Sequence, residues 1–281
     1  MSANAFGTRA IRIATPSHAA FAGVMIGLGI LGLVKRDFTA GFGPVPDGAP
    51  ARTALIYLCA LVPLVCGIGL VVGRTAAAAA RALLAYYLFW LLAVRVTYFA
   101  VVSSAIDGWY SWCETAVMTA GAWVLFTWLA TEADRRRLGF AAGAGGVRVA
   151  RVLYGFPLIL FGIAHYLYLE ATAPLVPDWL PWHVGWAYVT GATFILAGLA
   201  ILTGVWARLA ATLSVWQMAL FALLVWVPRA FAGVLSAFQW GEFYTTVALV
   251  SAGWIVADSY RGVPWSAARS GPSREPLVAS R

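Results

Sequence analysis

The chain is poor in charged residues and in cysteine. Only 11% of its 281 residues are charged, 62% are hydrophobic, and the mean hydropathy is +0.82. Soluble domains carry about 25% charged residues, so this composition excludes a water-soluble domain and predicts that most of the apolar surface faces lipid. The three cysteines, Cys59, Cys66 and Cys113, show no C-x-x-C spacing and provide no disulfide framework.

The net charge of +8 does not indicate a nucleic-acid partner. The basic residues form no stripe on a soluble fold, and in a membrane protein such an excess marks cytoplasmic loops. The expected partner of most of the surface is therefore the lipid bilayer of the plasma membrane.

Apolar segments recur along the chain at lengths that suit a bilayer, which takes about 20 helical residues to cross. Lipid leaves no water to satisfy open strand edges, so every span should be a helix. The predicted fold is all-α and polytopic, with eight spans at 18–34, 53–72, 76–102, 111–131, 149–169, 184–203, 207–231 and 242–257.

The chain contains an internal duplication. Residues 175–191 place two prolines and three tryptophans before an apolar segment, as when a short turn enters a membrane at an aromatic interface. The same landmarks occur earlier at a constant separation of 131 positions (188 − 57), in the pairs Val45 and Val176, Tyr57 and Tyr188, Gly67 and Gly198, Gly73 and Gly204, and Val94 and Val225. The eight spans are therefore expected to form two tandem four-helix bundles, residues 18–131 and 149–260.

The arginines predict the orientation of the chain. Fourteen fall on the side of the termini and of the linker 132–148, four basic residues fall on the opposite side, and Arg95 lies inside a span. Basic residues concentrate in cytoplasmic loops, so the linker and the terminal segments 1–17 and 261–281 are predicted to be cytoplasmic. The last segment is rich in Ser, Pro and Arg and is expected to be disordered. Since each half has an even number of spans, the halves should be related by an axis along the membrane normal.

The second half carries the residues of a known family. Its turn at 175–181, the following Trp186-Ala-Tyr-x-Thr-Gly191 and the ending Gly204-x-x-Ala-Arg208 resemble the DoxX-like integral membrane proteins, over residues 149–257. The first half is similar to a diverged copy, so the chain resembles a fused double DoxX module. Some members of this family accompany terminal oxidase or thiosulfate:quinone oxidoreductase subunits, and others act near redox or chaperone machinery. The paired cysteines of redox-active members are absent here.

The resemblance implies a small partner or subunit of a membrane redox or respiratory system, with quinone as a candidate contact, rather than an enzyme on its own. Two alternatives remain open: a carrier of a small lipophilic or anionic molecule, and a membrane-protein assembly factor. The sequence predicts no catalytic residue, no bound cofactor and no metal, and it leaves the oligomeric state open.

Four charged residues are candidates for a site near the outer boundary of the membrane. Arg95 lies at the outer boundary within the third span and Glu114 opens the fourth, while Arg229 at the end of the seventh span and Glu242 at the start of the eighth repeat this arrangement. Ionisable residues in spans mark functional sites and usually pair inward. We expect Arg95 to pair with Glu114 and Arg229 with Glu242, either as structural clamps between spans or as the lining of a ligand site.

His165 is the remaining candidate, in the outer third of the fifth span beside Tyr166 and Tyr168. No H-x-x-x-H or H-E-x-x-H spacing supports a metal at this position. A histidine that is hydrogen-bonded near a helix end is the structural alternative to a ligand-binding role.

Overall fold

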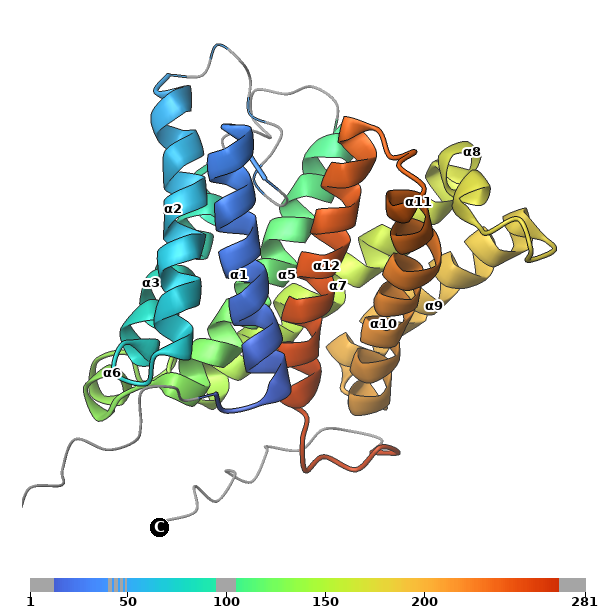
Figure 1. Cartoon of the computed structure of the whole chain (residues 1–281). Coiled ribbons are helices and arrows are strands. Elements are labelled where there is room, and N and C mark those ends of the chain that lie inside the picture. The colour runs from blue at the N-terminus through green and yellow to red at the C-terminus, as the bar shows by residue number, and fades with distance from the viewer. Residues whose placement is uncertain are drawn as a thin grey trace, which may run out of the picture.

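The computed structural model describes residues 13–39, 42, 45, 48, 50–94 and 105–267, and the regular structure in this part of the chain is helical (Figure 1). The first half contains α1 (Pro16–Lys35), α2 (Arg52–Val71), α3 (Ala76–Phe89), the π-helix η1 (Trp90–Val94) and α5 (Ala105–Leu129). The short α6 (Glu132–Arg137) lies between the halves. The second half contains α7 (Ala144–Leu167), α8 (Leu169–Thr172), the 3-10 helix η2 (Ala173–Leu175), α9 (His183–Thr203), α10 (Ala207–Phe221), the π-helix η3 (Ala222–Trp226), α11 (Val227–Phe231) and α12 (Ala237–Asp258).

Six helical stretches in this part of the chain are long and apolar enough to cross a membrane. They are Pro16–Lys35, Arg52–Val71, Ala76–Ala93, Ala144–Leu167, His183–Thr203 and Ala207–Phe231. The prediction of an all-α polytopic membrane protein is confirmed at this level. The helices α5 and α12 are 25 and 22 residues long but are not among the six.

The helix ends follow from local hydrogen bonding. Thr15 caps α1 by accepting from the backbone N–H of His18 at 3.1 Å, and Pro16 occupies the first turn, where no N–H is needed. Ser236 and Gln239 form a reciprocal capping box at the start of α12. These caps satisfy backbone donors that a membrane interface would otherwise leave partly exposed to lipid.

Glycines allow close contact between consecutive helices in both halves. A Cβ at Gly67 of α2 would lie 2.9 Å from the carbonyl oxygen of Ala22 in α1, and a Cβ at Gly198 of α9 would lie 2.5 Å from that of Gly155 in α7. Only a residue without a side chain fits such an approach.

The helices α5 and α12 form the centre of the molecule (Figure 1). They pack against each other where a Cβ on Gly121 would lie 2.8 Å from the Cβ of Ala252. Around this pair, α1 packs against α2 and α12, and α7 packs against α9 and α5. Most of the α5 surface from Ser111 to Phe126 is buried by protein, whereas α9 and α10 expose a series of large apolar side chains. Exposed apolar surface of this extent suits contact with lipid.

Two predicted segments extend beyond what the structure describes. Most of segment 1–17 and residues 268–281 lie outside the described residues, as do Pro46 and Asp47 of the first proline turn. The first residues of the expected tail lie against α10, where Arg208 donates to the carbonyl oxygen of Val263 at 2.8 Å and stacks over the ring of Trp265.

Asp134 joins the linker helix α6 to α3 on the predicted cytoplasmic side. Its carboxylate accepts from the Thr131 hydroxyl at 2.7 Å and pairs with Arg81 at 2.9 Å. These interactions, the Thr131 hydroxyl foremost, hold the pKa of the Asp134 carboxyl below its ordinary value. A lowered folded-state pKa stabilises the fold above the unfolded pKa of about 4, and this stabilisation is lost as the pH falls through the folded value.

Replacing Asp134 with asparagine should therefore lower the free energy of unfolding at neutral pH by about 1 kcal/mol, the typical worth of a helix cap. Thermal melts in detergent between about pH 3 and pH 7 would measure this, because the difference from the native protein should narrow below about pH 4. The control Glu132→Gln removes an exposed carboxylate from the same helix turn and should leave the melting temperature unchanged. A constant difference at every pH would contradict this role for the carboxylate.

Candidate functional site

A groove of about 2180 Å³ opens in the second half of the chain. Its walls come from α7, α9, α10 and α12, and residues of α1 and α5 close one end. Most of the lining is apolar, including Leu196, Leu199 and Leu213 on the helices that face lipid. An apolar groove with a few polar groups is the usual form of a ligand site.

Polar side chains gather at one end of the groove, the predicted outer end, which we define by Lys35, Thr39, Glu114, His165 and Glu242. The end of α1, the beginnings of α5 and α12 and the end of α7 lie toward the same side of the molecule, in the upper part of Figure 1. Three of the residues singled out from the sequence, Glu114, Glu242 and His165, are thus brought together in one groove.

The two carboxylates approach the groove from the central helices. Glu114 on α5 is 7% exposed, and Glu242 on α12 is half-buried. Tyr110 lines the groove together with both of them. A carboxylate in apolar surroundings favours a nearby hydrogen-bond donor or cation. The Glu242 carboxylate is therefore suited to a ligand that brings such a group.

His165 is oriented by its own helix. Its Nδ1 lies 2.8 Å from the carbonyl oxygen of Phe161, and because that oxygen can only accept, Nδ1 carries the hydrogen. In the neutral ring, Nε2 is then an acceptor. His18 differs, since its Nδ1 accepts from the N–H of Ala14 and its Nε2 contacts the carbonyl oxygen of Leu70 at 3.1 Å. His18 is fully satisfied within the fold, whereas His165 keeps one ring nitrogen for the groove.

The predicted arginine–glutamate pairs are not seen in the described residues. Arg95 lies outside them, so its pairing with Glu114 stays a prediction. Arg229 donates to the carbonyl oxygen of Pro174 at 2.9 Å rather than to Glu242. The reason is local, because Arg229 lies in the short helix α11, next to the η2 segment, and caps a backbone carbonyl there.

Two polar residues of the outer end were not singled out from the sequence. Lys35, the only lysine of the chain, lies 5.5 Å from the ring centre of Tyr244, a cation–π contact. Thr39 is 7% exposed, and its hydroxyl has no hydrogen-bond partner among the residues that the structure describes. Lys35 ends an apolar segment and Thr39 lies in a loop, so neither position carries a sequence signal for a groove.

Gln217 places a further polar group in the middle of the groove. It accepts from the Thr193 hydroxyl at 2.6 Å and donates to the carbonyl oxygen of Thr190 at 3.0 Å, which ties α10 to α9. An amide inside an apolar span is itself a signal for a functional or interhelical role, and the sequence reasoning did not use it.

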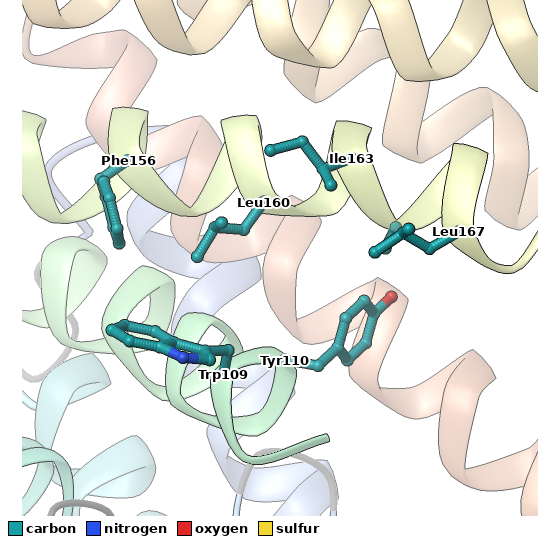
Figure 2. A pocket seen from close by; sticks show the side chains of 7 residues that line it. Trp109, Tyr110, Phe156, Leu160, Ile163 and Leu167 are labelled. Carbon is teal, nitrogen blue, oxygen red and sulfur yellow. The ribbon is translucent and has the colours of Figure 1, made fainter. Parts of the chain in front are cut away.

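A smaller apolar cleft of about 180 Å³ lies between α5 and α7 (Figure 2). Trp109 and Tyr110 face Phe156, Leu160 and Leu167 across it. Tyr110 and Ala164 line both this cleft and the groove.

Neither a metal cluster nor a disulfide is found where the structure describes the chain. No group of three or more His, Cys, Asp or Glu side chains could hold an ion there, and the three cysteines are buried and form no disulfide. The polar groups that line the groove include carboxylates, an imidazole, hydroxyls, amides and one ammonium.

The fold and the groove define a class, the polytopic α-helical integral membrane proteins. No family model and no solved structure matches the chain. A curated protein to which it is similar is a lipoprotein signal peptidase of Amoebophilus asiaticus (strain 5a2), with 28% identity over 120 residues. The match covers 40% of this chain and 48% of that protein, so the chain spans about half the length of the relative.

Proposed function

We propose that this chain is an eight-span plasma-membrane protein that binds a lipophilic molecule with a polar end, in the groove of its second half. The observation that carries this proposal is the groove itself, apolar along α9 and α10 and polar where Glu114, Glu242 and His165 lie. A molecule with an apolar tail and a polar end matches both parts.

The proposal has eight spans because it counts the two central helices, α5 and α12, as crossing the membrane in addition to the six most apolar ones. Both α5 and α12 are long enough to cross, since 22 residues extend about 33 Å at 1.5 Å per residue. Their polar side chains are covered by neighbouring helices, so these spans need less apolar surface than those that face lipid.

Helix contacts support the arrangement of the two halves as repeats. The Gly67 contact with Ala22 corresponds to the Gly198 contact with Gly155, at offsets of 131 (198 − 67) and 133 (155 − 22). In the centre, Gly121 meets Ala252, its own counterpart at 131 (252 − 121). A residue that meets its own equivalent is typical of a twofold axis.

The filled interior of the first repeat also favours a ligand in the second. In α3, Leu83 and Tyr87 are 0% and 1% exposed, and Tyr87 stacks on Phe42 at 5.9 Å. The helices α3 and α10 begin 131 positions apart (207 − 76), so Leu83 corresponds to Ser214 and Tyr87 to Met218. Both of these smaller side chains line the groove. The same scaffold is thus packed in one repeat and hollow in the other.

This function agrees best with the carrier hypothesis, and it also suits the respiratory one. A quinone of the bilayer is a lipophilic molecule with a polar ring, so a groove of this kind would serve a partner of a membrane oxidoreductase. Peptidase activity, named for the curated relative, is a second candidate. The observation in its favour is that two carboxylates line one groove, since paired carboxylates can divide acid and base roles.

The test is to extract and identify the lipophilic molecules that stay with the purified protein. The variant Gln217→Tyr/Met218→Tyr copies the Tyr86–Tyr87 pair of the first repeat into the groove. It should retain about tenfold less of the bound molecule than native protein, because the filled groove removes apolar burial worth about 1.4 kcal/mol or more. The control Leu58→Tyr changes a side chain of α2 that is 40% exposed and should retain the molecule.

Equal retention in native protein and in the filled variant would contradict the groove as the site. Cleavage of a lipidated peptide by the native protein, lost in both Glu114→Gln and Glu242→Gln, would instead favour the peptidase candidate.

A further inference from the structure

The outer end of the groove presents one positive and one negative side chain that do not pair with each other. Lys35 at the end of α1 and Glu242 in the second turn of α12 both line the groove. None of the ion pairs found among the described residues includes either side chain. Glu114 already interacts with another group of the chain, so the two charges that remain for a ligand are those of Lys35 and Glu242. Together they sum to zero, yet they are separate.

These two charges lie at a similar depth. Lys35 Nζ lies 5.5 Å from the ring centre of Tyr244, and Tyr244 follows Glu242 by two residues on α12. Two helical residues differ in height by about 3 Å. The ring covers one side of the ammonium, which carries three N–H donors, so donors remain for a ligand. A ligand with one charge would be attracted by one of these side chains and repelled by the other, whereas a zwitterion matches both.

The neutral groups at this end complement a zwitterion as well. Thr39 is buried and lines the groove, and its hydroxyl has no hydrogen-bond partner among the described residues. A buried hydroxyl without a partner costs free energy, so native structures rarely keep one away from a ligand or water. His165 keeps Nε2 as an acceptor because Nδ1 donates to the carbonyl oxygen of Phe161. The hydroxyl can donate to an anionic oxygen, and Nε2 can accept from an ammonium.

The apolar part of the groove opens toward lipid. Leu196, Leu199 and Leu213 line it and are 64%, 46% and 56% exposed on helices that we place in the membrane. A ligand with apolar chains can therefore enter sideways from the bilayer and lie along α9 and α10. This favours a lipid of the membrane over a molecule that arrives from water.

We propose that the ligand is a zwitterionic phospholipid of the bilayer, with its phosphate beside Lys35 and Thr39 and its ammonium beside Glu242 and His165. Lysine is a frequent phosphate ligand in proteins, and a carboxylate is the usual partner of an ammonium. This inference rests on the proposed function and adds the chemistry of the head group.

The experiment uses the full-length protein in dodecyl maltoside micelles, with native mass spectrometry to count bound lipid. Four probes share the same dioleoyl chains and differ in the head: phosphatidylethanolamine, phosphatidylglycerol, trimethylammonium-propane and diacylglycerol. The zwitterion should bind about tenfold more tightly than each of the other three, the worth of about one hydrogen bond to a charged group. Free glycerophosphoethanolamine, which has the head without the chains, should compete far more weakly because it buries no apolar surface.

Two variants should shift the preference in opposite directions. Glu242→Gln should abolish the advantage of phosphatidylethanolamine over the anionic phosphatidylglycerol, whereas Lys35→Met should abolish its advantage over the cationic lipid. Structural damage would instead weaken all four lipids alike. The controls Glu170→Gln and Arg36→Met remove exposed charges that do not line the groove, and both should keep the native preference.

The outcomes separate this inference from the proposed function. Equal affinity for the four lipids in the native protein would overturn the zwitterion and leave the groove as a lipophilic site. A native preference that survives in both Glu242→Gln and Lys35→Met would overturn the assignment of the two charges. Competition by free glycerophosphoethanolamine as strong as that of the whole lipid would overturn the bilayer phospholipid as the ligand. Failure of all four lipids to bind would count against the groove itself.

Discussion

Replacing Gly198 with leucine is expected to separate α9 from α7 and to destabilise the second half of the chain by about 3 kcal/mol or more, the upper range for overpacking a core. A Cβ at this position would lie 2.5 Å from the carbonyl oxygen of Gly155 and 2.6 Å from Ile159 Cγ1. The first of these atoms is backbone, so the clash cannot be relieved by a change of rotamer. Melting temperature and monodispersity in detergent measure the effect.

A matched glycine separates this clash from the general effect of the substitution. Gly27 lies on α1, and a Cβ there would meet nothing within 4 Å, so Gly27→Leu should leave the protein as stable as before or more so, because leucine favours helix over glycine by several tenths of a kcal/mol. Gly67→Leu should repeat the damage in the first half. If Gly198→Leu and Gly27→Leu melted alike, the close approach of α7 and α9 would not be a determinant of stability.

The sequence predicted the helical membrane class well because that class depends on composition and segment length. Apolar runs near 20 residues leave few other folds in lipid. The same reasoning placed Glu114, Glu242 and His165 near one face of the membrane, since depth along a helix follows from counting residues at 1.5 Å each. Depth is a one-dimensional property, and a sequence encodes it directly.

Lateral neighbours were harder to predict. Arg229 and Glu242 have similar depths, yet Arg229 bonds to Pro174 while Glu242 faces the groove. Which side chains meet depends on helix rotation and on crossing angles, and these are set by contacts such as that of Gly121 with Ala252. The groove was likewise missed, because its lining comes from several helices whose lateral arrangement the sequence does not encode directly.

The topology of the chain depends on whether α5 and α12 cross the membrane, and one reporter distinguishes the alternatives without ambiguity. If only the six most apolar helices crossed, the chain would cross the membrane three times, through α1, α2 and α3, before the linker. From a cytoplasmic N-terminus, three crossings would place the linker with Arg135–Arg137 outside the cell. If α5 crosses as well, the linker lies in the cytoplasm. A reporter active only in the cytoplasm, fused after Arg136, should therefore give full signal, because three consecutive arginines favour the cytoplasmic side.

The same reporter fused after Gly233, between α11 and α12, should be silent. With eight spans this loop is outside, whereas with six it would be cytoplasmic. The six-span alternative therefore predicts the opposite result for each of the two fusions. The difference is all-or-none and does not depend on stability. The physical reason for eight is that Glu114 of α5 is 7% exposed and Glu242 of α12 is half-buried, so neighbouring helices cover much of both carboxylates. A silent fusion at Arg136 together with an active one at Gly233 would reduce the protein to six spans and would leave both carboxylates outside any lipid-facing site.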